Sequence, residues 1–203
     1  MTLEIERKYL NVDFDALRPA LETHGARHIC AHFERNVLFD TAGAELFLSK
    51  RLLRLRVQEW PDKKRYLLAL KLPRISQNGC KICDEREVEV ADGASVSAIL
   101  EGLGYAVTAR YEKIREIWRL NAVEVCLDVL PFVTAVELEG EPARLSQTAA
   151  LLGLDNCMAS IKNYHDLHQD WRRQHTMPFE RSFVFSEKQR CFWRKKLGFA
   201  RDV

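Results

Sequence analysis

The chain has 203 residues, of which 47% are hydrophobic and 30% are charged, and 31 Lys and Arg against 29 Asp and Glu give a net charge of +2. These values are typical of a globular protein with a sizeable core, and they argue against a dedicated nucleic-acid-binding protein, which would carry a basic excess. No stretch approaches the roughly 18 apolar residues of a membrane span, and the N-terminus lacks the pattern of a signal peptide. We therefore expect a cytoplasmic protein with no membrane partner and with reduced cysteines.

The first predicted strand carries a row of charges. In Glu4-Ile5-Glu6-Arg7-Lys8 an extended backbone places Glu4, Glu6 and Lys8 on one face. Two carboxylates roughly 7 Å apart repel each other unless a cation lies between or opposite them. A solvated strand explains this stretch taken by itself, but the same arrangement recurs along the chain.

A helix and a strand follow. Because proline is disfavoured inside a helix, we expect a short turn near Phe14 and a helix that begins at about Pro19 and ends at Gly25. Weak alternation predicts a strand over residues 26–39 and a turn at residues 42–43. The two histidines of this strand have no clear third ligand and are expected at the surface: His28 and His32.

Two strands with basic residues come next. Residues 50–58 place Arg54 and Arg56 on one face and an apolar set on the other. A turn then leads into a strand over residues 65–72, with Lys71 near its end. The division into an apolar and a charged face is thus repeated.

An acidic strand follows a predicted loop. Residues 73–83 are expected to form this loop, with Cys80 and Cys83 as incidental thiols in a turn, because no second cysteine pair at zinc-site spacing follows. The strand over residues 84–90 alternates strictly, and its acidic face carries Glu85, Glu87 and Glu89. A helix capped by Ser95 is expected to end at two glycines, Gly102 and Gly104.

The remaining strands carry charges of both signs. They are predicted over residues 109–120, 123–130 and 136–140. Their charged faces include, in order, Lys113 and Arg115, then Asp128, then Glu137 and Glu139. Helices are expected from Pro142 to Gly153 and over residues 161–173.

The last segment differs in composition, because basic residues alternate with aromatic ones. Ser186 and Gln189 predict a capping box for a short helix that ends at Gly198. Nucleic acid, a membrane or a partner subunit could contact such a segment, but docking on its own domain is favoured because the aromatic rings need burial. We therefore divide the chain into a domain of residues 1–175 and a basic aromatic extension of residues 176–203.

The charged faces suggest a shared interior. If the strands close into a barrel with helices outside, these faces line a polar lumen. Arg and Lys side chains there would suit the phosphates of a polyanion, and the carboxylates would hold Mg²⁺ or Mn²⁺, which prefer oxygen ligands. Burying either the basic or the acidic side chains without the other set would leave their charges unbalanced.

The order of motifs along the chain carries a resemblance to a known family. The motifs are E-x-E-x-K, an F-D-T turn, an L-R-L-R strand, a Lys-ended strand, an R-E-V-E-V strand, a K-x-R strand, an Asp-bearing strand and V-E-L-E-G. In this order they resemble the CYTH family, the triphosphate tunnel metalloenzymes. The resemblance covers roughly residues 1–168. It implies an α+β fold in which an eight-stranded antiparallel β-barrel, with helices packed outside, binds a triphosphate and one or two divalent metal ions.

The resemblance also implies residue roles by motif position. Catalytic roles fall to Glu6, Lys8 and Arg56. The triphosphate-binding residues would be Lys8, Arg54, Arg56, Lys71, Lys113, Arg115 and Lys162. The metal ligands would be Glu4, Glu6, Asp128, Glu137 and Glu139, supported by Glu87 and Glu89.

Within the family the chain resembles the class IV adenylate cyclase branch, through its LGY stretch and its LPFVTAVELEG segment. The expected reaction converts ATP into cyclic AMP and pyrophosphate. Hydrolysis of inorganic tripolyphosphate or thiamine triphosphate is the alternative, and a non-catalytic binder of polyphosphate or nucleotide is a third option. The expected partner is a small-molecule triphosphate, and a homodimer is one option for the assembly.

Overall fold

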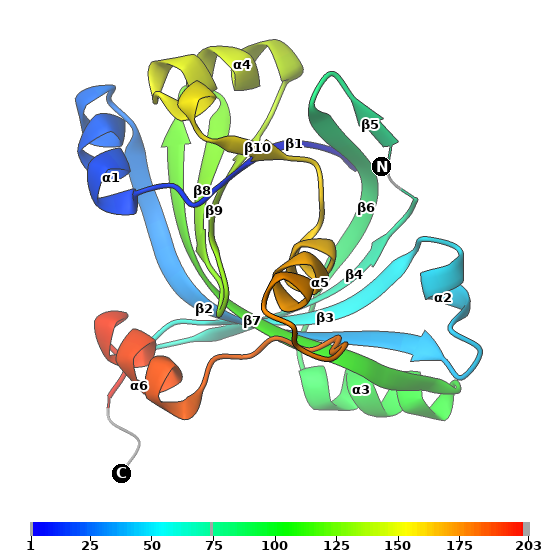
Figure 1. Ribbon diagram of the computed structural model, residues 1–203. Coiled ribbons are helices and arrows are strands. Elements are labelled where there is room, and N and C mark those ends of the chain that lie inside the picture. The colour runs from blue at the N-terminus through cyan, green and yellow to red at the C-terminus, as the bar shows by residue number, and fades with distance from the viewer. Residues whose placement is uncertain (1, 74, 201–203) are drawn as a thin grey trace.

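The computed structural model describes residues 2–73 and 75–200 and shows a closed ring of strands surrounded by helices (Figure 1). The eight strands of the ring are β1 (Thr2–Leu10), β2 (Arg27–Thr41), β3 (Leu52–Glu59), β4 (Lys64–Lys71), β6 (Cys80–Val90), β7 (Tyr105–Leu120), β8 (Val123–Val129) and β9 (Thr134–Glu139). They pair antiparallel in the order β1-β9-β8-β7-β2-β3-β4-β6, and pairing of β6 with β1 closes the ring. The predicted α+β fold with an eight-stranded antiparallel barrel is confirmed.

Short elements and helices flank the ring. The helices are α1 (Phe14–Thr23), α2 (Glu45–Leu48), α3 (Gly93–Gly102), α4 (Pro142–Leu151), α5 (Tyr164–Gln174) and α6 (Glu187–Lys196), with a 3₁₀ turn η1 (Leu154–Asn156). Strand β5 (Ile75–Gln77) pairs with β6, and β10 (Met158–Ser160) pairs with the end of β1. None of the helices in residues 2–73 and 75–200 is long and apolar enough to cross a membrane.

The strand that closes the barrel begins in the segment predicted to be a loop. Residues 75–90 form a hairpin of β5 and β6 around Asn78 and Gly79, whose φ angles of 52° and 72° suit a tight turn. Cys80 and Cys83 therefore lie on a strand and are only 2% and 4% exposed. The loop prediction was wrong because the start of β6 is hydrogen-bonded to β5 and also to β1, which is distant in sequence.

Two helix starts also differ from the prediction. The side chain of Asp13 accepts the first amides of α1, so the helix begins before Pro19 and contains it. Three apolar side chains of this helix are buried against the barrel wall and offset the disfavoured proline: Phe14, Leu17 and Leu21. Helix α3 is capped by Asp92, not by Ser95.

The apolar core lies on the outer surface of the barrel wall. Helices α1 and α4 cover one side, where Leu21 and Leu145 pack against Leu138 of β9. Helix α3 covers another side, where Leu100 packs against Leu55 of β3. Because each strand alternates its side chains, the opposite face of every strand points into the ring. The interior is thereby lined mainly by polar side chains.

The C-terminal segment pairs with β7 beside α5 and then packs on the outer face of β2 and β7. Phe183 forms a parallel bridge with Tyr111, and Phe185 is buried against Phe33. Glu112 accepts the backbone N–H of Phe185 at 3.0 Å and pairs with a tail arginine, Arg190, at 3.1 Å. The predicted docking of the tail on its own domain and the capping box of α6 are both confirmed. The last three residues of the extension, 201–203, lie outside the described residues.

The division between residues 1–175 and 176–203 stays a prediction, which truncation tests. Deleting residues 176–203 is expected to destabilise the protein by about 3–5 kcal/mol, because it uncovers Phe33 and leaves Glu112 without its tail partners. Urea unfolding measures this, with the exposed substitution Lys188→Ala as the control. An unchanged unfolding midpoint in the truncated chain would show that residues 1–175 fold independently of the tail.

His165 makes the stability of the α5 region depend on pH. Its ring contacts Tyr111 and Phe183 at centroid distances of 5.2 and 5.0 Å, and burial lowers its pKa from 6.5 to about 4. Between these two values the unfolded chain binds a proton that the folded chain does not. Stability is therefore expected to fall by roughly 2 kcal/mol as the pH drops from 6.5 to 4. His165→Phe should reduce the loss seen in urea unfolding by roughly this amount, whereas His24→Gln at the surface should leave it unchanged.

Candidate functional site

The register of the strands brings the predicted charged residues together inside the ring. Residues directly opposite each other on paired strands share a face. Four such pairs are Glu6 with Glu139, Lys8 with Glu137, Arg115 with Asp128, and Lys71 with Glu85, of which the first two join the N-terminal strand to a strand far along the chain. The interior thus contains alternating groups of both signs from separate strands.

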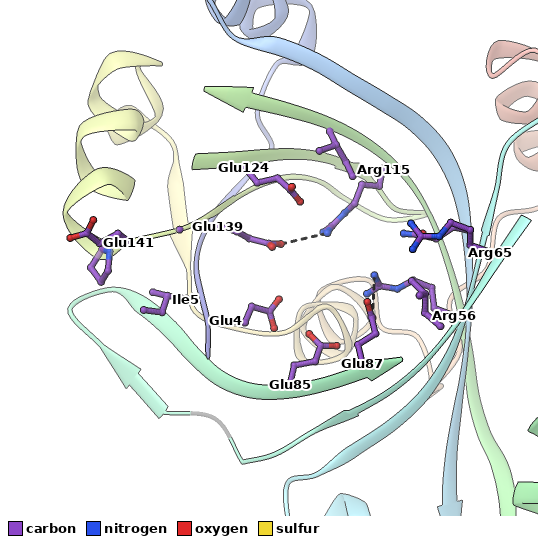
Figure 2. A pocket seen from close by; sticks show the side chains of 15 residues that line it. Glu4, Ile5, Arg56, Arg65, Glu85, Glu87, Arg115, Glu124, Glu139 and Glu141 are labelled. Carbon is purple, nitrogen blue, oxygen red and sulfur yellow. Dashed lines mark ion pairs between the residues drawn. The ribbon is translucent and has the colours of Figure 1, made fainter. Parts of the chain in front are cut away.

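A cavity of about 780 Å³ occupies one end of this interior (Figure 2). Its charged lining consists of Glu4, Glu85, Glu87, Glu124, Glu139, Glu141, Arg56, Arg65 and Arg115. Figure 2 shows Glu4, Glu85 and Glu139 facing the same space as Arg56 and Arg115. Six carboxyl groups against three guanidinium groups leave the lining with an acidic excess, so a polyanion would need further cations to bind here.

The opposite end is filled by α5. The hydroxyl of Tyr164, the first residue of this helix, donates to Asp128 at 2.7 Å. The Nζ of Lys8 lies 4.5 Å from the centre of the Tyr164 ring and donates to the carbonyl of Lys162 at 3.1 Å. This end of the interior is therefore packed, and access is through the cavity.

Lys8 is held between two carboxylates. It is 2% exposed, and its Nζ lies 2.9 Å from Glu137 and 3.1 Å from Glu6. Burial alone would lower its pKa, but Glu137 and Glu6 outweigh burial and raise that pKa well above its ordinary value. Lys8 therefore stays a cation, suited to binding phosphate and unsuited to taking a proton.

Arg115 and Lys113 converge on Asp128. The guanidinium of Arg115 donates two hydrogen bonds to Asp128, at 2.8 and 2.6 Å, and also pairs with Glu137. Lys113 reaches the same carboxylate at 3.0 Å. Asp128 is completely buried and its oxygens accept from three side chains, Tyr164 included. Its role in this structure is to hold basic residues in place.

A second basic cluster contains Lys71 and Arg54. Lys71 lies 2.6 Å from Glu4 and 2.8 Å from Glu85, and Arg54 lies 2.9 Å from Glu85. Burial raises the pKa of Glu85, but Lys71 and Arg54 outweigh it and bring that pKa down to about 2. Glu87 lies at 3.5 Å from Arg54 and 3.9 Å from Arg56. This acidic strand therefore positions basic side chains.

Glu139 is a carboxyl group of the cavity whose negative charge is only partly balanced by neighbouring cations. Burial raises its pKa to about 8, Glu4, Glu137 and Glu6 contribute in the same direction, and Arg115 at 3.5 Å offsets only part of this. Its side chain is 24% exposed and lines the cavity. A cation beside Glu139 and Glu4 would relieve this repulsion.

Carboxylate oxygens are the donors that Mg²⁺ and Mn²⁺ prefer, so the donor chemistry fits these ions. Within residues 2–73 and 75–200, however, no three acidic, His or Cys side chains already form a cage for a metal. Glu6 and Glu137 are engaged with Lys8. An incoming ion would therefore have to compete with basic side chains for them.

Two predicted residues lie apart from the others. Lys162 extends outward, 53% exposed, and pairs with Asp170 at 2.5 Å. Glu89 is 55% exposed and pairs with Arg65 at 2.7 Å at the rim. The other predicted site residues face the interior as their strand alternation implies.

The sequence reasoning missed residues on β2. His32 was predicted at the surface, but it is 1% exposed and its Nε2 lies 3.0 Å from Glu34, so that prediction was wrong. Glu34 is completely buried, and the next inward residue, Asn36, is 1% exposed. The alternation of polar residues at positions 32, 34 and 36 was the available signal. Lys81, which lies 2.8 Å from Glu6, was hidden in the predicted loop.

Comparisons with known proteins point to one family. The model of the CYTH domain family matches residues 2–151, and no curated protein matches the sequence at a significant level. A candidate adenylate cyclase from Vibrio parahaemolyticus superposes with a TM-score of 0.72 at 21% identity, covering 83% of this chain and 98% of its own. The candidate adenylyl cyclase HpAC1 from Hippeastrum, whose description reports a dominant triphosphatase activity, gives 0.61 at 18% identity, covering 87% and 97%. At these identities the likeness shows the fold.

Replacing Lys8 tests the ion pairs of the interior. Lys8→Met is expected to destabilise the protein by about 3–5 kcal/mol, because two buried carboxylates lose their shared partner. Adding Glu137→Gln should restore about 1 kcal/mol of this, because it removes a buried charge that Arg115 alone would otherwise have to balance. Urea unfolding of the single and double variants measures both effects. Lys64→Met, at an exposed position, controls for the loss of charge, and equal destabilisation by it would contradict the pairing argument.

Proposed function

Because this chain belongs to the CYTH domain family, we propose that it is a divalent-metal-dependent enzyme that acts on a triphosphate inside its barrel. The observation that carries the proposal is the cavity in which Arg56 and Arg115 face Glu4 and Glu139. Guanidinium groups bind phosphate oxygens with paired hydrogen bonds. Carboxylates beside them suit the cations that accompany a triphosphate.

Each group of residues has a proposed role. Arg56, Arg115 and Lys113 bind the phosphates, and Lys8, Arg54 and Lys71 supply positive charge behind them. Mg²⁺ or Mn²⁺, when held by Glu4, Glu6 and Glu139, supplies charge that neutralises phosphate oxygens. Asp128 and Glu137 remain proposed ligands that also orient Arg115. These side chains stabilise the charge that develops on the leaving phosphate.

The walls of the cavity favour a substrate with an organic group. Beside the charged residues, the lining contains Leu67, Ile117 and the neutral amide of Gln58. A volume of about 780 Å³ is in the range of sites for small organic ligands. Because such a lining suits ATP and thiamine triphosphate alike, the description of the Vibrio parahaemolyticus protein is what favours ATP. We therefore place the adenylate cyclase reaction first, in which the ribose 3′-hydroxyl of ATP attacks the α-phosphate and pyrophosphate leaves.

Hydrolysis is the second candidate, and the description of the Hippeastrum protein favours it. In this reaction water attacks the terminal phosphate of tripolyphosphate or thiamine triphosphate, which becomes orthophosphate, and pyrophosphate or thiamine diphosphate is the leaving group. The same basic residues would stabilise the leaving group in both reactions. The reactions differ in the nucleophile and in the phosphate that it attacks. We also propose that the protein acts in the cytoplasm.

Product analysis separates the candidates. The purified protein is incubated with Mg²⁺ or Mn²⁺ and either ATP or tripolyphosphate, and the products are resolved by chromatography. Cyclic AMP with pyrophosphate is expected for the cyclase, and orthophosphate from tripolyphosphate for the hydrolase. Binding of both compounds without any product, also when thiamine triphosphate is supplied, would instead indicate a non-catalytic binder.

Variants of one cavity residue, Arg56, and one buried residue of the barrel interior, Glu6, connect the reaction to the site. Arg56→Ala and Glu6→Ala are each expected to lower kcat/KM at least about 100-fold, because charge stabilisation of this kind contributes several kcal/mol to the transition state. Arg86→Ala and Glu101→Gln change charges that are exposed outside the barrel and should leave turnover unchanged. Full activity in both Arg56→Ala and Glu6→Ala would place the reaction elsewhere.

A further inference from the structure

Strand β2 contributes a buried carboxylate to the interior that the roles above do not use. Glu34 is completely buried, and β2 lies between β3 and β7 in the ring. Its residue partners across the two ladders are Gln58 and Lys113. Glu34 therefore lies between two strands that each carry proposed phosphate-binding residues.

The two oxygens of Glu34 have different surroundings. Oε1 lies 3.0 Å from the Nε2 of His32. Oε2 makes no hydrogen bond to any described residue, but the Nε of Arg56 and the Nζ of Lys113 lie 3.6 Å from it. At this distance the carboxylate attracts both cations without occupying their N–H groups. One carboxylate thus holds a cation from β3 and a cation from β7.

The other contacts of Arg56 and Lys113 keep both side chains pointing into the barrel. Arg56 donates to Asn36 at 3.4 Å and approaches Glu87 at 3.9 Å, and Lys113 donates to Asp128 at 3.0 Å. Arg56 also lines the cavity. The contacts of Arg56 to Asn36 and Glu87 are few and long, so its guanidinium retains N–H groups that can donate to a phosphate.

His32 fixes the carboxylate from behind. Its ring is 1% exposed and lies 4.8 Å from the ring of Trp60. Its Nε2 is 3.3 Å from the amide nitrogen of Gln58, and its Nδ1 is 3.8 Å from the Sγ of Cys30. A side chain packed on all sides in this way keeps one orientation. The position of Glu34 therefore follows from that of His32.

We propose that Glu34, held by His32, is a positioning residue that sets the spacing of Arg56 and Lys113 for the phosphates of the substrate. This inference rests on the proposed function. The negative charge of Glu34 opposes a bound phosphate, so the arrangement weakens binding while it aligns the two cations. A residue with this role affects affinity and turnover in opposite directions, whereas a merely structural residue weakens both.

Glu34→Gln tests the proposal, because it removes the charge and keeps the shape. Pyrophosphate is the binding probe, since it is a product of the cyclase reaction and of tripolyphosphate hydrolysis, and its affinity in Mg²⁺ is measured by titration calorimetry. The variant is expected to bind pyrophosphate about 3- to 10-fold more tightly, because a like charge near the phosphate is lost. Its kcat, on whichever of ATP and tripolyphosphate the parent converts, should fall roughly tenfold or more, because the cations are misplaced.

Glu34→Asp is the second variant, which keeps the charge and shortens its reach. It is expected to lower kcat while leaving the pyrophosphate affinity within about twofold of the parent, because the charge remains near the phosphate. Glu22→Gln, an exposed change of the same charge on α1, should match the parent in both measurements. Thermal unfolding confirms that each variant is folded.

The outcomes separate this inference from the proposed function. Weaker or unchanged pyrophosphate binding by Glu34→Gln, or an unchanged kcat in both Glu34 variants, overturns the positioning role while the parent still binds and reacts. A parent that neither binds pyrophosphate nor converts either substrate overturns the proposed function, and the positioning role with it. If the parent binds without turnover, the tighter binding of Glu34→Gln alone decides the inference.

Discussion

The interior of this barrel depends on the pairing of opposite charges across neighbouring strands. A buried charge without a partner costs several kcal/mol, so each ammonium or guanidinium group taken into the ring requires a carboxylate beside it. Lys8 between Glu6 and Glu137, and Arg115 on Asp128, satisfy this requirement with contacts of 2.6 to 3.1 Å. The antiparallel register is what places these groups opposite each other.

This pairing also constrains how the site can work. The basic residues that suit a triphosphate are engaged with carboxylates, so a ligand must exchange one set of partners for another. The exchange is balanced when anions and cations enter together, because phosphates can replace carboxylates at the basic groups while metal ions take up the carboxylates released. The acidic excess of the cavity and the raised pKa of Glu139 both agree with such a joint entry.

Much of the site could be predicted because alternation along a strand decides which residues share a face. The rows Glu4-Glu6-Lys8, Arg54-Arg56 and Lys113-Arg115 all face the interior, as that rule implies. Lys162 lies in no strand, and it was placed by its motif position alone; its side chain points outward to Asp170. His32 and Glu34 were missed because alternating polar residues on a strand look the same whether they face solvent or a polar lumen.

By itself the sequence determined the eight strands, the faces of their side chains and the family, because these follow from local alternation and from the order of motifs. It did not determine the closure of the barrel, since β6 begins in a segment whose strand structure comes from hydrogen bonds to β1. Nor did it determine which oppositely charged side chains form ion pairs, how α5 fills one end of the barrel, or that the charge of Glu139 is only partly balanced. These depend on distances between segments far apart in the chain, which only the tertiary structure sets.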